Sequence, residues 1–206
     1  SAITATLTTL IMGTLSDRTR SRLGRRRPFI LFGYTLWGLS TILFPTVAYI
    51  KLTGLAVVMV VIADAVMTFF GSTANDAAFN AWTTDIATTD QRGRVEGVLN
   101  LSVFIAQIIS MVAAGILIDN VGYFTFFYVL GGIVLLVGLV AGSLLKDVPP
   151  PEPAGPRRSF WTEFTSLFSL ETLRSNRKLF ILLLFIMISS IGMQVSFPYM
   201  IVYLEN

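Results

Sequence analysis

Long apolar runs, each separated from the next by a short charged stretch, constrain this chain more than any other feature of its sequence. We expect membrane spans at residues 28–50, 54–82, 97–118, 123–145 and 179–203. As helices, all of these can cross a hydrocarbon core of about 30 Å. Residues 1–13 rise only about 20 Å as a helix, so we interpret them as the end of a longer span. Only 13% of the residues are charged, against roughly a quarter in soluble proteins. The sequence therefore predicts a polytopic membrane protein.

The spans are predicted to be helices, because a backbone in lipid must satisfy its own hydrogen bonds. The segments are also too long and too uniformly apolar for the strands of a membrane barrel. Pro28 is expected to open its helix, whereas Pro45 and Pro198 are expected to kink theirs. The predicted fold class is all-α, a polytopic transmembrane helical bundle.

The basic residues indicate which loops face the cytoplasm. Residues 14–27, 83–96 and 146–178 hold 14 of the 15 Lys and Arg residues, which leaves Lys51 for the opposite face. The positive-inside rule therefore places these loops on the cytoplasmic side of a multi-pass protein in the cell membrane. Lipid headgroups explain this charge better than nucleic acid does, so membrane lipids are expected partners and nucleic acid is not.

A proline-rich stretch at residues 148–156 divides the chain, because it cannot form a regular helix. We expect an N-terminal bundle at residues 1–145, a cytoplasmic linker at 146–178 and the first helix of a second bundle at 179–206. Within the linker, aromatic and leucine residues recur at helical spacing between Phe160 and Phe168. They predict a short amphipathic helix, either on the inner membrane surface or packed on the ends of the bundle.

The chain has no cysteine and no histidine. This excludes disulfides, zinc sites built on these residues, thiol nucleophiles and catalytic triads with an imidazole base. We expect no cofactor, no metal and no enzymatic activity. An intramembrane aspartyl protease needs two carboxylates that face each other across helices, whereas the acids inside the spans, Asp64 and Asp76, share one predicted helix.

The most specific motif is the charged loop that runs from Gly13 to Pro28. Asp17, near the carbonyl end of a helix, is unfavourable unless cations compensate it, and the arginines of the loop supply them. Gly13 lies one turn earlier and leaves room for a neighbouring helix. Such a loop can lock two helix ends together and release them. The alternative is that the arginines only orient the protein in the membrane.

This loop resembles the signature loop between the second and third helices of the major facilitator superfamily. Its ending, Gly24-Arg25-Arg26-Arg27-Pro28, is most similar to glycoside-pentoside-hexuronide cation symporters and the related sucrose transporters. Asp85 and the turn from Asp90 to Arg94 resemble the charged turn between the fourth and fifth helices of those carriers. The resemblance spans the end of helix two through helix seven. We therefore expect a fragment of a partial major facilitator fold, with the remainder of the same transporter chain as its partner.

The resemblance implies that the two charged loops form a salt-bridge network, with Asp17, Arg25 or Arg26, Asp85 and Arg94 as its members. In the family, this network holds the cytoplasmic side closed. The cytoplasmic gate residues it implies here are Gly13, Asp17, Arg18, Gly24, Arg25, Arg26, Asp85, Arg92 and Arg94.

Ionisable residues inside a span are costly and seldom lack a role, so Asp64 and Asp76 are candidates for binding the substrate or an ion. Asp64 lies about 14 Å along its helix from Leu55, near the midplane, and Asp76 lies about 32 Å along, near the inner boundary. At 100° per residue, Asn75 shares the face of Asp64, and Asp76 lies on another face. Asp64 is the better candidate for a coupling carboxylate, because desolvation at the midplane favours a bound proton. The alternative is a carboxyl group that only hydrogen-bonds a neighbouring helix.

Further candidates for substrate contact pair aromatic rings with amides, as sugar sites commonly do; they are Trp37, Gln107, Gln194 and Tyr199. The same residues could instead join helices or anchor the membrane interface. The resemblance implies a secondary transporter that moves a small polar solute by alternating access. A sugar or glycoside with a proton or sodium ion is the leading hypothesis, and a drug, an organic acid or a non-transporting sensor remains open. Residues 1–13 lack the paired acids of the resembled symporters, which leaves the coupling ion open.

Overall fold

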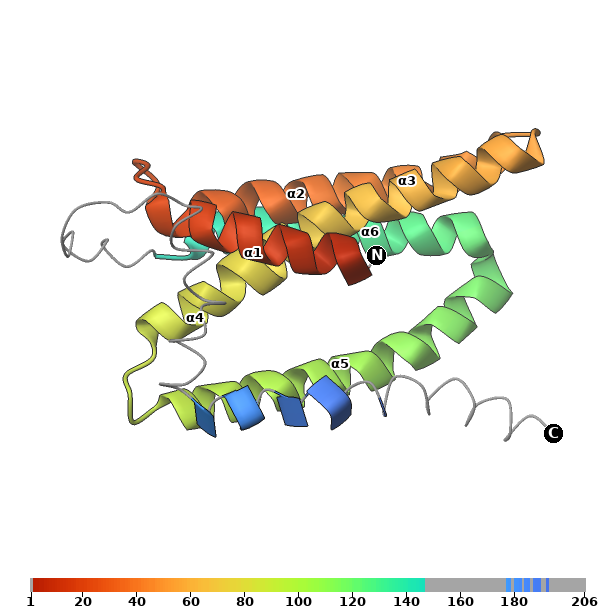
Figure 1. Ribbon diagram of the computed structural model, residues 1–206. Coiled ribbons are helices and arrows are strands. Elements are labelled where there is room, and N and C mark those ends of the chain that lie inside the picture. The colour runs from red at the N-terminus through yellow and green to blue at the C-terminus, as the bar shows by residue number, and fades with distance from the viewer. Residues whose placement is uncertain are drawn as a thin grey trace. The chain divides into compact units, whose positions relative to one another are not determined.

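The computed structural model (Figure 1) describes residues 2–146 and, further along the chain, residues 177–178, 180–182, 184–185, 187–189 and 192. The chain divides into two units, Ser1–Glu152 and Pro153–Asn206. The predicted linker, its amphipathic helix, Gln194, Pro198 and Tyr199 lie outside the described residues, as does most of the predicted span at 179–203.

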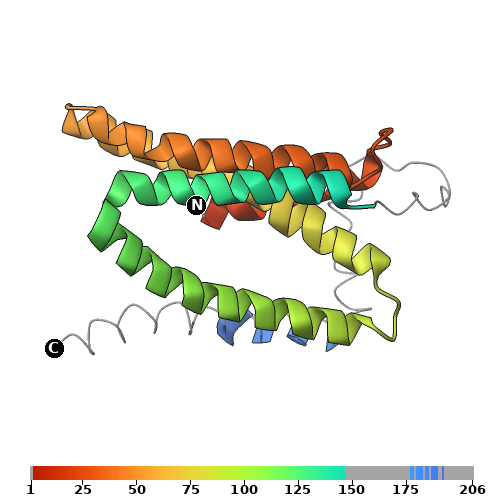
Figure 2. The same ribbon diagram turned by 180° about the vertical axis from the view of Figure 1, so that it is seen from behind.

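The first unit is built of helices joined by short turns (Figures 1 and 2). Its α-helices are α1 (Ala2–Arg18), α2 (Arg27–Leu43), α3 (Thr53–Gly71), α4 (Asn80–Ile86), α5 (Arg92–Val121) and α6 (Tyr123–Leu144). A 3-10 segment, η1 (Phe44–Tyr49), continues α2, and a π-helical segment, η2 (Ser72–Phe79), joins α3 to α4. No strand occurs among the described residues, so the predicted all-α fold class is confirmed.

Helical segments in the described part of the chain are long and apolar enough to cross a membrane at Arg27–Tyr49, Thr53–Ile86, Arg92–Val121 and Tyr123–Leu144. They correspond to the predicted spans at 28–50, 54–82, 97–118 and 123–145. The second and third are longer than predicted, because polar and charged residues continue a helix beyond its apolar run. The first predicted segment also continues, as α1 reaches Arg18 and places Asp17 in its last turn. The protein is membrane-embedded.

Helices α2 and α6 form the most extensive contact among the described elements and run side by side (Figures 1 and 2). Glycines permit this approach, because a Cβ atom at Gly38 would lie only 2.7 Å from the Leu135 backbone nitrogen. A Cβ atom at Gly131 would lie 2.8 Å from the carbonyl oxygen of Gly38. In lipid, helices associate through such close backbone packing rather than through hydrophobic burial. Close packing against α6 therefore fixes the position of α2 and of its polar residues.

Two prolines lie near the start and the end of the segment formed by α2 and η1. Pro28 lies in the first turn of α2, where its missing N–H removes no helical bond, as predicted. Pro45 lies in η1, where the backbone tightens into a 3-10 helix before the chain turns toward α3.

The segment predicted as one regular helix at 54–82 is interrupted by η2. In η2 the hydrogen bonds span five residues, and the Asn80 N–H accordingly bonds to the Asn75 carbonyl oxygen. Each residue of a π-helix turns through less than the 100° of an α-helix. The predicted angles of Asn75 and Asp76 about the helix axis assumed α-helical turning throughout, so they do not apply beyond Gly71.

Candidate functional site

Charged side chains gather where α1 and α4 end and α2 begins, and we call Asp17, Arg25, Arg26 and Asp85 the arginine cluster. The Arg26 guanidinium pairs with the Asp17 carboxylate through Nη2 and with Asp85 Oδ2 through Nε, at 3.2 Å. Arg25 Nη2 lies 2.5 Å from the same Asp85 oxygen. The cluster therefore joins the ends of α1 and α4 to the start of α2.

Arg26 is the buried member of the cluster. Its side chain is 6% exposed, whereas those of Asp17 and Asp85 are 54% and 27% exposed. Its Nη1 also donates a hydrogen bond of 2.5 Å to Oγ of the buried Ser16. A buried guanidinium is tolerated only when its donors are partnered, so Arg26 requires both carboxylates to remain in place.

A tight turn between α1 and α2 returns the arginines to the end of α1. The Gly24 N–H donates to the Ser21 carbonyl oxygen at 3.0 Å, and Gly24 has a φ angle of 103°. That left-handed conformation is available to glycine at little cost and strains other residues. Gly24 thus positions Arg25 and Arg26 without contacting the carboxylates.

The remaining predicted gate residues lie outside the arginine cluster. Arg18 ends α1 and is exposed. Arg92 and Arg94 are exposed in the first turn of α5, and within the described residues no ion pair joins either of them to the cluster. A Cβ atom at Gly13 would meet nothing within 4 Å. The close helix approach predicted at Gly13 is therefore not made by the described part of the chain.

Arg27 makes a contact with the end of α6 that the sequence did not predict. Its Nε donates to the Gly142 carbonyl oxygen at 2.6 Å and its Nη2 to that of Ser143 at 2.5 Å. Trp82 donates from Nε1 to the Lys146 carbonyl oxygen at 3.1 Å. These bonds satisfy carbonyl groups at and after the end of α6, where a helix favours positive charge. Arg27 at the start of α2 and Trp82 on α4 thus both reach the end of α6.

A second polar feature lies inside the spans, and we call Tyr34, Asn75 and Asp76 the polar chain. The Tyr34 hydroxyl donates to Asn75 Oδ1 at 3.0 Å, and Asn75 Nδ2 donates to Asp76 Oδ1, also at 3.0 Å. Asn75 is half-buried and Asp76 is exposed. An acid at membrane depth is costly unless it faces a bundle interior or a water-filled cavity.

The π-helical segment η2 is held against α2 by small residues. A Cβ atom at Gly33 would lie 2.8 Å from Cβ of Ala74, so any larger residue there would push η2 away. One turn of α2 further on, Trp37 packs against Gly71, where an added Cβ would lie 3.1 Å from the indole ring. The rings of Tyr34 and Trp37 lie 5.8 Å apart. An aromatic surface, a phenol, an amide and a carboxylate are thus brought together. π-turns of this kind occur frequently at functional sites.

The other predicted site residues are not part of this group. Asp64 is half-buried on α3, before η2 begins, and Gln107 is exposed on α5. Tyr34, in contrast, was not predicted. The available signal was its hydroxyl within an apolar span, because a buried tyrosine hydroxyl usually finds a hydrogen-bond partner.

The family of the chain follows from comparison with known proteins. The whole chain, residues 1–206, matches the family model of the Major Facilitator Superfamily. Neither the curated proteins nor the solved structures contain a significant match. The match agrees with the all-α fold and with the charged loop between α1 and α2. The chain therefore belongs to the major facilitator superfamily of membrane transporters.

Proposed function

We propose that this protein is a secondary active transporter of the cell membrane that moves a sugar or glycoside, together with a proton or sodium ion, by alternating access. One observation carries the proposal: the polar chain lies inside membrane-spanning segments, beside the ring of Trp37. Polar and ionisable groups at membrane depth are costly, and they mark the pathways of substrates and ions.

The chemistry of the polar chain favours a solute with several hydroxyl groups. A phenol, an amide and a carboxylate offer both donors and acceptors within one short stretch, and each sugar hydroxyl can use both. The ring of Trp37 supplies an apolar surface for the less polar face of a sugar ring. Sites for small molecules typically combine a few polar groups with such apolar walls.

A coupling ion requires a carboxylate that the solute pathway reaches. Asp76 accepts one hydrogen bond from Asn75, and a carboxylate has about four acceptor positions, so it can bind a proton or sodium ion as well. Asp64 is the second candidate, because it lies earlier in the same span, toward the midplane. We propose that at least one of the two carries the coupled ion.

The arginine cluster is proposed as part of the cytoplasmic gate. Its carboxylates are partly exposed, so the pair of Arg25 and Asp85 can separate at a modest cost of about 1 kcal/mol or less. The buried Arg26 guanidinium costs more to leave unpaired, so opening requires that water or other acceptors replace its carboxylates. An arrangement that is ordered when closed and can be solvated when open suits a gate. We propose that it closes against the second helical bundle of the same transporter, with the two bundles rocking about a site near the midplane.

The proposal is tested by measuring uptake and counterflow of labelled sugars. The carrier is purified from its membrane and reconstituted into liposomes for these measurements. Asn75→Leu removes the central member of the polar chain and is expected to abolish transport. The matched control, Asn120→Leu, changes an exposed asparagine at the end of α5 and should leave transport intact. Equal transport by both variants would remove the polar chain from the mechanism.

Asp64→Asn and Asp76→Asn separate coupling from binding. A variant that has lost the coupling carboxylate should still exchange labelled sugar, but it should no longer accumulate sugar against a gradient. Accumulation by both variants would contradict the coupling role proposed for these acids. Exchange of organic acids or drugs but of no sugar would replace the substrate class, and binding without exchange would indicate a sensor.

A further inference from the structure

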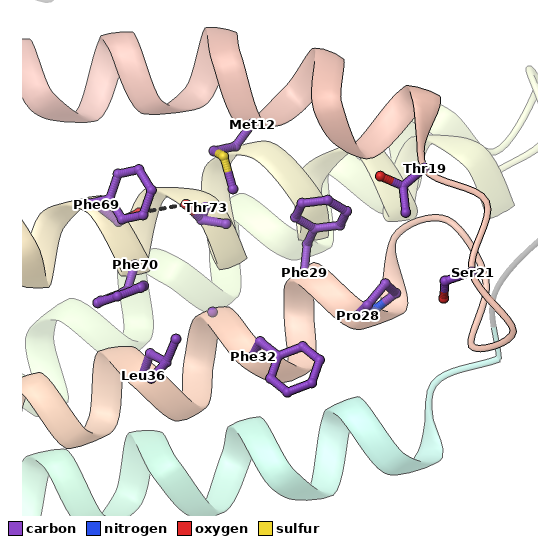
Figure 3. A pocket seen from close by; sticks show the side chains of 11 residues that line it. Met12, Thr19, Ser21, Pro28, Phe29, Phe32, Leu36, Phe69, Phe70 and Thr73 are labelled. Carbon is purple, nitrogen blue, oxygen red and sulfur yellow. Dashed lines mark hydrogen bonds between the residues drawn. The ribbon is translucent and has the colours of Figure 1, made fainter.

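An apolar groove lies between α1, α2 and α3, apart from the polar chain (Figure 3). Its volume is about 310 Å³, and its walls include Met12, Phe29, Phe32, Leu36 and Phe69. Phe32 is 60% exposed, so the groove opens toward the outside of the described bundle. These walls offer almost no polar atom, which makes the groove unsuitable for the sugar proposed above.

The groove extends over the depth of one lipid leaflet. Leu36 lies about 14 Å along α2 from Arg27, and half of a hydrocarbon core is about 15 Å thick. The other end of the groove reaches the turn that precedes α2, where Thr19 and Ser21 line it. The part along α2 thus lies at the depth of acyl chains, and the end at the turn lies at the depth of headgroups.

The end of the groove at Ser21 lies beside positive charge. Arg20 and Arg22 flank Ser21 in the sequence and are exposed, and within the described residues neither forms an ion pair. The nearest acid along the chain, Asp17, is already paired with Arg26. Anionic headgroups gather at the cytoplasmic surface of a membrane, where they attract such basic segments.

We propose that this groove binds one anionic glycerophospholipid. Its acyl chain lies along Phe29, Phe32 and Leu36, and its phosphate lies between Arg20 and Arg22. The basic end favours a lipid over a further helix of the carrier, because an apolar helix offers no anion to Arg20 and Arg22, whereas an anionic headgroup does.

The test is native mass spectrometry of the delipidated carrier, with phosphatidylglycerol and phosphatidylcholine of identical acyl chains as the probes. The parent protein is expected to retain one phosphatidylglycerol in preference to phosphatidylcholine. Arg20→Gln combined with Arg22→Gln should weaken phosphatidylglycerol binding by about 30-fold. The control, Lys51→Gln, removes a charge from the loop before α3 and should have no effect.

The groove itself is tested by Phe32→Ala, which should weaken binding of phosphatidylglycerol by about threefold. Its matched control is Phe104→Ala on α5, because Phe32 and Phe104 are 60% and 61% exposed and only Phe32 lines the groove. All variants should elute as the parent does in size-exclusion chromatography, since the changed side chains are exposed.

Three results would overturn the proposal. Undiminished phosphatidylglycerol binding by the double arginine variant would remove the headgroup site. An equal effect of Phe32→Ala and Phe104→Ala would indicate general contact with surrounding lipid. A parent protein that retains no phosphatidylglycerol would indicate that another helix covers the groove.

Discussion

The arginine cluster and the polar chain each join α2, or the turn before it, to neighbouring helices. They differ in the interactions that stabilise them. The cluster depends on full charges, with Arg26 buried between two carboxylates. The polar chain depends on two hydrogen bonds and on the unusual backbone of η2. One region is ordered by charge attraction and the other by close packing of small residues. Their responses to substitution and to salt should therefore differ.

The largest expected effect comes from removing both carboxylates of the arginine cluster. Asp17→Asn combined with Asp85→Asn leaves the buried Arg26 guanidinium without its charged partners, which should cost about 3 kcal/mol of stability. The measurement is the thermal unfolding of the purified protein in detergent. The control, Asp90→Asn with Asp119→Asn, changes two exposed acids and should cost less than about 0.5 kcal/mol. Equal losses in the two double variants would show that the cluster has no special role.

A smaller effect is expected when the packing behind the polar chain is disturbed. Gly33→Ala places a Cβ atom 2.8 Å from Cβ of Ala74 and should cost about 1–3 kcal/mol, because α2 and η2 must move apart. It should also weaken solute binding, since Tyr34 and Asn75 lie on these two elements. Gly132→Ala is the matched control, because a Cβ atom there meets nothing within 4 Å. Unchanged stability and solute affinity in Gly33→Ala would contradict the packing account.

The smallest expected effect is that of salt on the unfolding temperature, and it should come from the arginine cluster rather than from the polar chain. Raising the salt concentration from 0.1 M to 1 M shortens the screening length from about 10 Å to about 3 Å. The partly exposed pair of Arg25 and Asp85 should then lose less than about 1 kcal/mol, which lowers the unfolding temperature slightly. The variant without Asp17 and Asp85 should lose this part of the salt response. A response of the same size in that variant would place its source elsewhere.

Much of the fold could be predicted from the sequence, because each span is a local property of its own residues. The apolar runs predicted the helices, and the motif from Gly13 to Pro28 indicated Asp17, Arg25 and Arg26 as interacting residues. Asp85 was included because the second charged loop also resembled the family. These residues carry charges in a chain with few charges, which makes them conspicuous.

The remaining contacts depend on which helices become neighbours, and no local pattern shows this. The π-helical segment η2 alters the turn per residue around Asn75 and Asp76, and no proline or other interruption in the sequence predicts it. Tyr34 meets Asn75 only because Gly33 lets α2 approach η2. Arg27 bonds to the end of α6, far along the chain, whereas its neighbour Arg26 turns toward α1 and α4.

The central claim, that the polar chain binds the transported solute, is tested most directly by the affinity of Tyr34→Phe in counterflow. This substitution removes one hydroxyl group and keeps the ring beside Trp37. Loss of the hydrogen bond to Asn75 should weaken the apparent affinity about tenfold. The control, Tyr128→Phe, changes an exposed tyrosine on α6 and should leave the affinity unchanged. Parent-like affinity in Tyr34→Phe would contradict the claim.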